Sequence, residues 1–238
     1  MSGLLPLSED RKFRGRRARL VKQLRDKGIA DEAVLAAIGR VKRHRLVESG
    51  WHHRAYHDEA LPLGDRQTIS QPFTVATQSG LLQVQPGDRV LEVGTGSGYQ
   101  AAVLCEMGVA VYSIERVAPL LAQTTERLRA LAYLGQGPGK VHARLGDGTL
   151  GWANEAPFDA IVVTAAAVGI PDALTHQLRR PTANTPGGRL VIPVGDARGQ
   201  QMLRLTRTGE ATFSKEPFGA FAFVPLVGRA SGARFRDG

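Results

Sequence analysis

Apolar residues near the start of the chain recur with the three-to-four-residue spacing of amphipathic helices. They form two groups: Leu20, Val21 and Leu24, then Val34, Leu35, Ile38 and Val41. Gly28 is a typical helix terminator and Asp31 a typical N-cap, so the pattern predicts two helices within residues 17–54. Residues 1–16 are polar and rich in arginine, and we expect them to be disordered.

From residue 77 onward, short apolar runs alternate with helical segments. The expected strands are 90–93, 109–114, 141–145, 158–164, 190–193, 202–206 and 221–226. Alternation of strands and helices predicts an α/β fold with a doubly wound, mostly parallel, seven-stranded sheet. The last two runs have no helix between them and predict a terminal antiparallel pair. We expect a single domain over residues 17–228, with a helical preface (17–54), a loop (55–76) and the α/β core (77–228), followed by a disordered tail (229–238).

The most informative stretch is DRVLEVGTGSGYQ, Asp88 to Gln100. An apolar strand ends there in three alternating glycines, Gly94, Gly96 and Gly98, and a helical segment follows. Glycines let the backbone turn sharply and approach a ligand that a Cβ would exclude. A strand, a glycine turn and a helix N-terminus together predict a nucleotide-type site.

Two acidic residues indicate which cofactor this turn holds. Glu115 closes the next strand about twenty residues beyond Gly94, where such folds place a carboxylate on a ribose. Glu92 precedes Gly94 by two residues, and its charge would repel a pyrophosphate but attract the ammonium and sulfonium of S-adenosylmethionine. The motif therefore favours S-adenosylmethionine. A dehydrogenase turn with an incidental Glu92 is the alternative.

Two loops carry further candidates. Residues 55–76 are too polar and too punctuated by proline and glycine for a regular element, and a long ordered loop beside a nucleotide fold is typically functional. Within it, Ser70 is either the N-cap of the helix that Pro72 begins or a catalytic side chain. Asp147, in the Gly-Asp-Gly after the third strand, is either an acceptor for an adenine amino group or part of a simple turn.

Composition narrows the class of protein. The chain has 238 residues, a net charge of +9 and a single cysteine, Cys105, which excludes an internal disulfide and is expected to be buried. The basic residues lack interleaved aromatics, so a solvated surface is favoured over nucleic-acid binding. Neither a signal peptide nor an apolar run of ~20 residues is present, and we expect a cytoplasmic protein without membrane contact. The histidines at 52, 53 and 57 lack the spacing of a metal site, so no metal is expected.

Seven segments together resemble the protein-L-isoaspartate O-methyltransferase family, which are class I S-adenosylmethionine-dependent methyltransferases. They are YHDEALPLGDRQTISQP, VLEVGTGSGYQAAVL, VYSIER, GDG-x-x-GW, APFDAIVVTAAA, GGRLVIPVG and FVPL. The resemblance runs from about residue 20 to residue 228, and TISQP is its most specific part. It implies transfer of a methyl group to the α-carboxylate of L-isoaspartyl residues in damaged proteins and peptides, by a monomer.

The resemblance also implies roles for individual residues. Ser70 is the counterpart of the active-site serine, and the cofactor contacts fall on Glu92, Gly94 and Gly96 for the methionine end, Glu115 for the ribose, and Asp147 with Gly148 for the adenine. The substrate cleft is formed by Thr68, Ile69, Val224, Pro225 and Leu226. The chain departs from the family pattern at Arg66, where a glycine is usual, and at Lys42 and Leu46, where proline and phenylalanine are usual.

The chemistry agrees with this assignment. A carboxylate is already ionised at neutral pH, so it can attack a sulfonium methyl without a general base, and Ser70 would orient it. Two alternatives stay open: another class I methyltransferase acting on RNA or a small molecule, and a methyltransferase-fold binding module without turnover.

Overall fold

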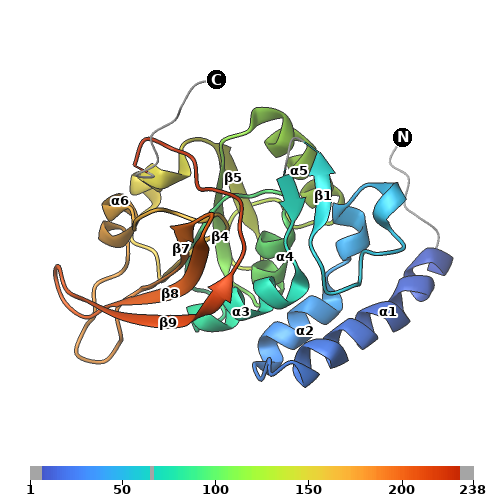
Figure 1. Ribbon diagram of the computed structural model, residues 1–238, viewed down its shortest axis with the longest axis horizontal. Coiled ribbons are helices and arrows are strands. Elements are labelled where there is room, and N and C mark those ends of the chain that lie inside the picture. Colours follow the sequence, from blue (N-terminus) through green and yellow to red (C-terminus); the bar gives the residue numbers. More distant parts are fainter. Residues whose placement is uncertain (1–6, 65–66, 231–238) are drawn as a thin grey trace.

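A seven-stranded sheet forms the centre of the computed structural model, which describes residues 7–64 and 67–230 (Figure 1). Its strands are β3 (Arg89–Val93), β4 (Ala110–Glu115), β5 (Val141–Leu145), β6 (Ala160–Val163), β7 (Arg189–Asp196), β8 (Gly199–Arg207) and β9 (Phe213–Phe221). They lie in the order β5-β4-β3-β6-β7-β8-β9. The first five strands in this order, from β5 to β7, are parallel, and β8 and β9 are added antiparallel at one edge. The predicted fold class is confirmed.

Helices cover both faces of this sheet. One face carries α3 (Pro72–Leu82), α4 (Tyr99–Glu106) and α5 (Ala118–Ala130), and the other carries α6 (Asp172–His176). The two N-terminal helices, α1 (Leu7–Asp26) and α2 (Glu32–Arg40), pack on α3 and α4. Side chains of β3 alternate between the faces, so Val90 packs in one cluster with Leu104 of α4, and Leu91 packs in another with Leu174 of α6. Short 3-10 turns occupy Arg43–Leu46, Ser49–Trp51, Gly148–Leu150 and Ala153–Glu155. None of the helices in the described ranges is both long and apolar enough to cross a membrane.

The helical preface follows the sequence signals closely. Asp31 caps α2, because its carboxylate accepts hydrogen bonds from the backbone N–H groups of Ala33 and Val34 at 3.0 and 3.1 Å. Gly28 adopts a φ of +97° just after α1 ends, which suits a glycine. Figure 1 shows α1 and α2 packed side by side, away from the antiparallel edge of the sheet.

The expectation of disorder over residues 1–16 is wrong from Leu7 onward, where α1 begins. Phe13 explains the difference: only 4% of it is exposed, and its ring stacks on the His44 ring with centroids 4.1 Å apart. His52 packs edge-on against Phe13. Phe13 thus extends the buried face of α1, which Leu20 and Leu24 continue, to the N-terminal half of a polar, basic helix. Residues 1–6 lie outside the described part of the chain.

Residues 55–76 are more regular than expected. They contain an antiparallel pair, β1 (Leu61–Gly64) and β2 (Gln67–Ile69), before α3 begins at Pro72 as predicted. The apolar side chains of Leu61, Leu63 and Ile69 are buried and stabilise this pair of strands. The polar composition of the segment gave no sign of this packing. Arg66 lies outside the described residues.

The last predicted strand is misplaced. β9 covers Phe213–Phe221, an exposed edge strand whose polar residues hid it, and the apolar run after it makes only an isolated bridge between Ala166 and Pro225. The backbone N–H groups of Arg229 and Ala230 then donate to Asp147 Oδ2 (2.8 Å) and Thr149 Oγ1 (3.1 Å). The first two residues of the expected disordered tail are therefore held in place, and residues 231–238 lie outside the description.

Candidate active site

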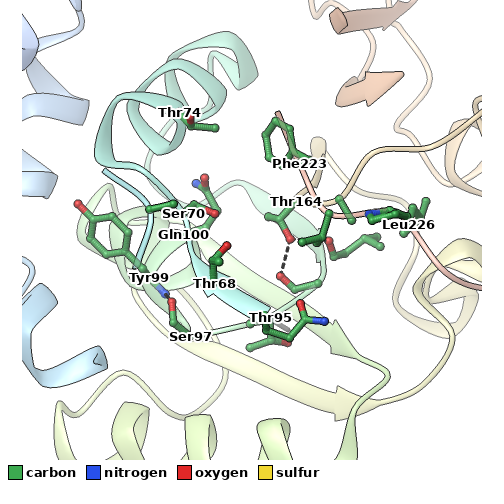
Figure 2. A pocket seen from close by; sticks show the side chains of 18 of the residues that line it. Thr68, Ser70, Thr74, Thr95, Ser97, Tyr99, Gln100, Thr164, Phe223 and Leu226 are labelled. Carbon is green, nitrogen blue, oxygen red and sulfur yellow. Dashed lines mark hydrogen bonds between the residues drawn. The ribbon is translucent and has the colours of Figure 1, made fainter. Parts of the chain in front are cut away.

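A cavity of about 810 Å³ opens at the carboxyl ends of the parallel strands (Figure 2). Its lining comes from residues in four segments, 67–74, 93–100, 114–117 and 220–227, together with Gly148, Thr164 and a few neighbours. This is the edge where open α/β sheets bind their ligands. Figure 2 shows Thr68, Ser70 and Gln100 on one side of the cavity, with Phe223 and Leu226 on the other.

The three glycines of the turn have different reasons to lack a side chain. A Cβ on Gly94 (φ +96°) would lie 2.4 Å from Thr164 Oγ1, which donates to the Gly94 carbonyl at 2.7 Å. A Cβ on Gly98 would press on Leu128 at 3.0 Å, where α4 packs on α5. Gly96 lines the cavity, and a Cβ there would meet nothing within 4 Å. Gly96 thus leaves the backbone open to a ligand.

Glu115 lies at the end of β4 and lines the cavity, at the position expected of a ribose clamp. Its Oε2 accepts a hydrogen bond from the Gly96 N–H at 3.0 Å, and its Oε1 accepts from the N–H groups of Arg116 and Val117 at 2.8 and 3.0 Å. The carboxylate therefore joins the glycine turn to the end of the neighbouring strand. It is only 6% exposed, so its charge is turned toward the site and away from bulk water.

Glu92 lies beneath the turn and does not line the cavity. Its side chain is fully buried, and its Oε2 accepts a hydrogen bond from the Ser113 hydroxyl, which also contacts the Thr95 hydroxyl at 2.6 Å. Burial raises the pKa of Glu92 to about 8, against the hydrogen bond from Ser113 and with the help of the nearby charge of Glu115. Thr95 lines the cavity where direct contact by Glu92 was expected, so Glu92 reaches the site through two hydroxyl groups.

Ser70 lines the cavity and does not cap α3. Gln71 occupies the N-cap position, and the Phe73 N–H donates to the carboxylate of Asp58 at 2.8 Å. The capping interpretation of Ser70 is therefore wrong. Within the described part of the chain, its hydroxyl makes no hydrogen bond, while its carbonyl accepts one from Arg43 Nη2 at 3.0 Å. The hydroxyl is thus available to a ligand.

Both carboxylate oxygens of Asp147 already accept hydrogen bonds from other residues of the chain. Oδ1 accepts from the N–H and the hydroxyl of Thr149 at 2.9 and 2.6 Å, and Oδ2 accepts from the Arg229 N–H. Burial opposes ionisation, but these hydrogen bonds together lower the pKa of Asp147. Asp147 does not line the cavity, whereas Gly148 does; a Cβ on Gly148 would lie 2.5 Å from Val93 Cγ1. Of the expected adenine pair, only Gly148 borders the space where a ligand would bind.

The expected substrate cleft is largely brought together. Thr68, Val224, Pro225 and Leu226 line the cavity. Ile69 does not, because residues of β2 alternate in direction and Ile69 is fully buried on the core side.

Several residues of the cavity escaped the sequence analysis. Gln200, which lies behind the cavity lining, holds the backbone of Phe223: its amide donates to the Phe223 carbonyl at 3.0 Å and accepts from the Phe223 N–H at 2.7 Å. Thr164 was missed although its position carries a signal, because it is the first polar residue after the apolar strand β6. Tyr99 and Gln100, at the start of α4, also line the cavity.

Comparison with known proteins identifies similar chains over nearly the whole length. The model of the protein-L-isoaspartate(D-aspartate) O-methyltransferase family matches residues 15–231. Protein-L-isoaspartate O-methyltransferase of Salinibacter ruber is 56% identical over 229 residues, 94% of this chain and 97% of that protein. The Cytophaga hutchinsonii enzyme of the same name is 49% identical, covering 91% of this chain and 92% of its own.

Solved structures agree on the fold. A protein-L-isoaspartate O-methyltransferase structure superposes with a TM-score of 0.79 at 24% identity, over 90% of this chain and 67% of that chain. A putative protein-L-isoaspartate O-methyltransferase from Plasmodium falciparum, in complex with S-adenosyl-L-homocysteine, gives a TM-score of 0.74 at 24% identity, over 89% of this chain and 98% of that chain.

Proposed function

This chain belongs to the protein-L-isoaspartate(D-aspartate) O-methyltransferase family, and we propose that it performs that family's reaction. In this reaction the methyl group of S-adenosylmethionine moves to the α-carboxylate of an L-isoaspartyl residue in a damaged protein or peptide. The observation that carries the proposal is the single cavity wall shared by the glycine turn and the TIS segment. Gly96 and Glu115 line it beside Thr68 and Ser70, so cofactor and acceptor groups would meet there.

The residues at the turn suit the cofactor. Glu115 would accept hydrogen bonds from the ribose hydroxyls, and the open backbone at Gly96 leaves room for the methionine end. Glu115 places a carboxylate at the cavity, which favours a cationic ligand over a pyrophosphate. Glu92, with its pKa raised to about 8, is mostly protonated at neutral pH and adds little charge behind the turn. When bound, S-adenosylmethionine supplies an electrophilic methyl group on a positively charged sulfur.

The proposed methyl transfer needs no general acid or base from the protein. An isoaspartyl carboxylate is ionised at neutral pH, so the chain's residues need only hold it in line with the methyl–sulfur bond. The Ser70 hydroxyl would donate a hydrogen bond to the carboxylate oxygen that does not react. The methyl group would pass to the carboxylate oxygen while sulfur kept the electron pair of the broken carbon–sulfur bond, so the residues of the chain would have no proton to transfer.

The opposite wall would exclude water from the reacting groups. Phe221, Phe223, Val224 and Leu226 line it with apolar side chains, and the Gln200 clamp fixes the backbone of Phe223. A dry site strengthens each electrostatic contact inside it. We also infer a cytoplasmic monomer that binds no nucleic acid. The lack of aromatic residues interleaved with the basic residues supports the last point, although the net charge is +9. Light scattering after gel filtration tests the monomer.

Methyl transfer to paired peptides tests the reaction. The chain is incubated with labelled S-adenosylmethionine and either an isoaspartyl peptide or its aspartyl counterpart. Base-labile methyl ester on the isoaspartyl peptide alone is expected. Label on RNA or a small molecule instead would favour another class I methyltransferase, and cofactor binding by calorimetry without any transfer would favour a binding module.

A further inference from the structure

Arg43 is a fully buried arginine behind the Ser70 segment. Its Nη1 donates to the Ala55 carbonyl at 2.6 Å, and its Nη2 donates to the carbonyls of Glu59 and Ser70 at 2.9 and 3.0 Å. All three acceptors belong to the backbone. One guanidinium therefore connects both ends of residues 55–59 to Ser70, whose hydroxyl lines the cavity.

No described carboxylate forms an ion pair with this guanidinium. Burial lowers the pKa of Arg43, and a buried cation without a carboxylate is costly to a fold. Its Nε also lacks a hydrogen-bond partner among the described residues. An apolar side chain would leave these backbone carbonyls without their donors, so the arrangement depends on the planar guanidinium, which can reach several acceptors at once.

The same side chain reaches the cofactor side of the cavity. The guanidinium carbon lies 5.2 Å from the centre of the Tyr99 ring. Tyr99 follows Gly98 directly, begins α4 and lines the cavity (Figure 2). Arg43 therefore contacts the segment that carries Ser70 through hydrogen bonds and the helix that ends the glycine turn through its flat face.

We propose that Arg43 is a positioning residue that sets the separation between Ser70 and the glycine turn. It touches neither substrate nor cofactor, because it lies outside the cavity lining. The inference rests on the proposed methyl transfer: Arg43 aligns the acceptor carboxylate with the methyl group by fixing these two segments of one cavity wall against each other. Small errors in such alignment have large effects on rate.

Arg207 offers a matched control. It is also a buried arginine, only 5% exposed, and it also donates to backbone carbonyls, those of Leu178 at 2.6 Å and Gly209 at 3.1 Å. It packs over the Phe213 ring at 6.0 Å and does not line the cavity or contact the Ser70 segment. Arg207→Lys thus removes a similar guanidinium from a part of the fold outside the cavity.

The test compares Arg43→Lys with Arg207→Lys. We expect Arg43→Lys to lower kcat for the isoaspartyl peptide by about tenfold or more, with the Kd for S-adenosylhomocysteine changed by less than about twofold. Arg207→Lys is expected to lower the melting temperature and leave kcat unchanged. Wild-type kcat in Arg43→Lys, or an equal loss in Arg207→Lys, overturns the proposal.

Amide hydrogen exchange provides a readout that does not depend on turnover. Residues 67–71 should exchange faster in Arg43→Lys than in the wild type and be unchanged in Arg207→Lys; unchanged exchange in Arg43→Lys overturns the proposal. If the wild-type protein transfers no methyl group, the proposed function is wrong. The exchange rates of residues 67–71 would still show whether Arg43 holds the Ser70 segment in place. Should Arg43→Lys not fold, Arg43→Gln, which keeps a planar pair of N–H donors, is compared in the same way.

Discussion

The hydroxyls of Thr95 and Ser113 lie 2.6 Å apart beneath the glycine turn. Thr95 faces the cavity and Ser113 donates to the carboxylate of Glu92, so the two hydroxyls connect a fully buried acid to the site. An acid in this position responds both to the solvent pH and to the charge of a bound ligand.

Glu92 should make stability depend on pH. Its pKa is about 8 in the folded state and near ~4.3 in the unfolded chain, so the folded state binds more protons between these values and loses stability as the pH rises through that window. Glu92→Gln mimics the neutral acid and removes this loss. Urea unfolding from about pH 5 to about pH 8 should show the variant gaining on the wild type as the pH rises; parallel curves would contradict it.

Ser70→Ala should affect turnover and spare cofactor binding. The hydroxyl lines the cavity and is not used by the fold, so its loss removes an orienting hydrogen bond, with kcat lowered by about tenfold to a hundredfold. Initial rates with the isoaspartyl peptide and calorimetry with S-adenosylmethionine measure the two effects. Ser214→Ala, at an exposed position of β9, is the control. Unchanged turnover would remove Ser70 from the mechanism.

Alanine at two glycines of the turn should have different effects. Gly94→Ala places a Cβ 2.4 Å from Thr164 Oγ1 at a φ of +96° and should lower the free energy of unfolding by about 2 kcal/mol or more. Gly96→Ala meets no atom within 4 Å and should cost about 1 kcal/mol, but its methyl group enters the cavity and should weaken cofactor binding. Urea denaturation and calorimetry separate the two. A larger stability loss for Gly96→Ala would refute this account.

Cys105 should be inert in the native protein. It is 5% exposed, and burial raises the pKa of its thiol, with further help from the charges of Glu92 and Glu106. We expect alkylation at least about a hundredfold slower in the folded protein than in urea. Mass spectrometry after timed iodoacetamide labelling measures the ratio, and rapid native labelling would show that the helix α4 opens readily.

Local signals predicted the core of this fold well. Asp31, the glycine turn and the apolar strands of the parallel part of the sheet are each predicted from a few neighbouring residues, and these features appear as expected. The last apolar run, 221–226, does not form the strand that it predicts. The pair β1–β2 was missed because its strands are short and its burial comes from Leu61 and Ile69, which are isolated in a polar stretch.

The residues that the sequence did not reveal depend on distant partners. Arg43 sits among basic residues that read as a solvated surface, and its acceptors are backbone carbonyls as far away as Ser70. Asp147 lies in the turn that the sequence predicted. Its hydrogen bond with the Arg229 N–H joins two segments that are far apart in the sequence, so no local pattern could predict it. Tertiary hydrogen bonds to the backbone leave no trace in the spacing of side chains.

The wall formed by residues 220–227 is nearly the last part of the described chain to leave the ribosome, whereas residues 67–74 emerge early. A nascent polypeptide therefore carries only half of its site until synthesis is almost finished. A chain that ends after β8 would have the same deficit, because it would lack the Phe223 backbone that Gln200 holds. A fragment that ends before residue 220 therefore lacks one wall of the cavity, and we expect it to transfer no methyl group.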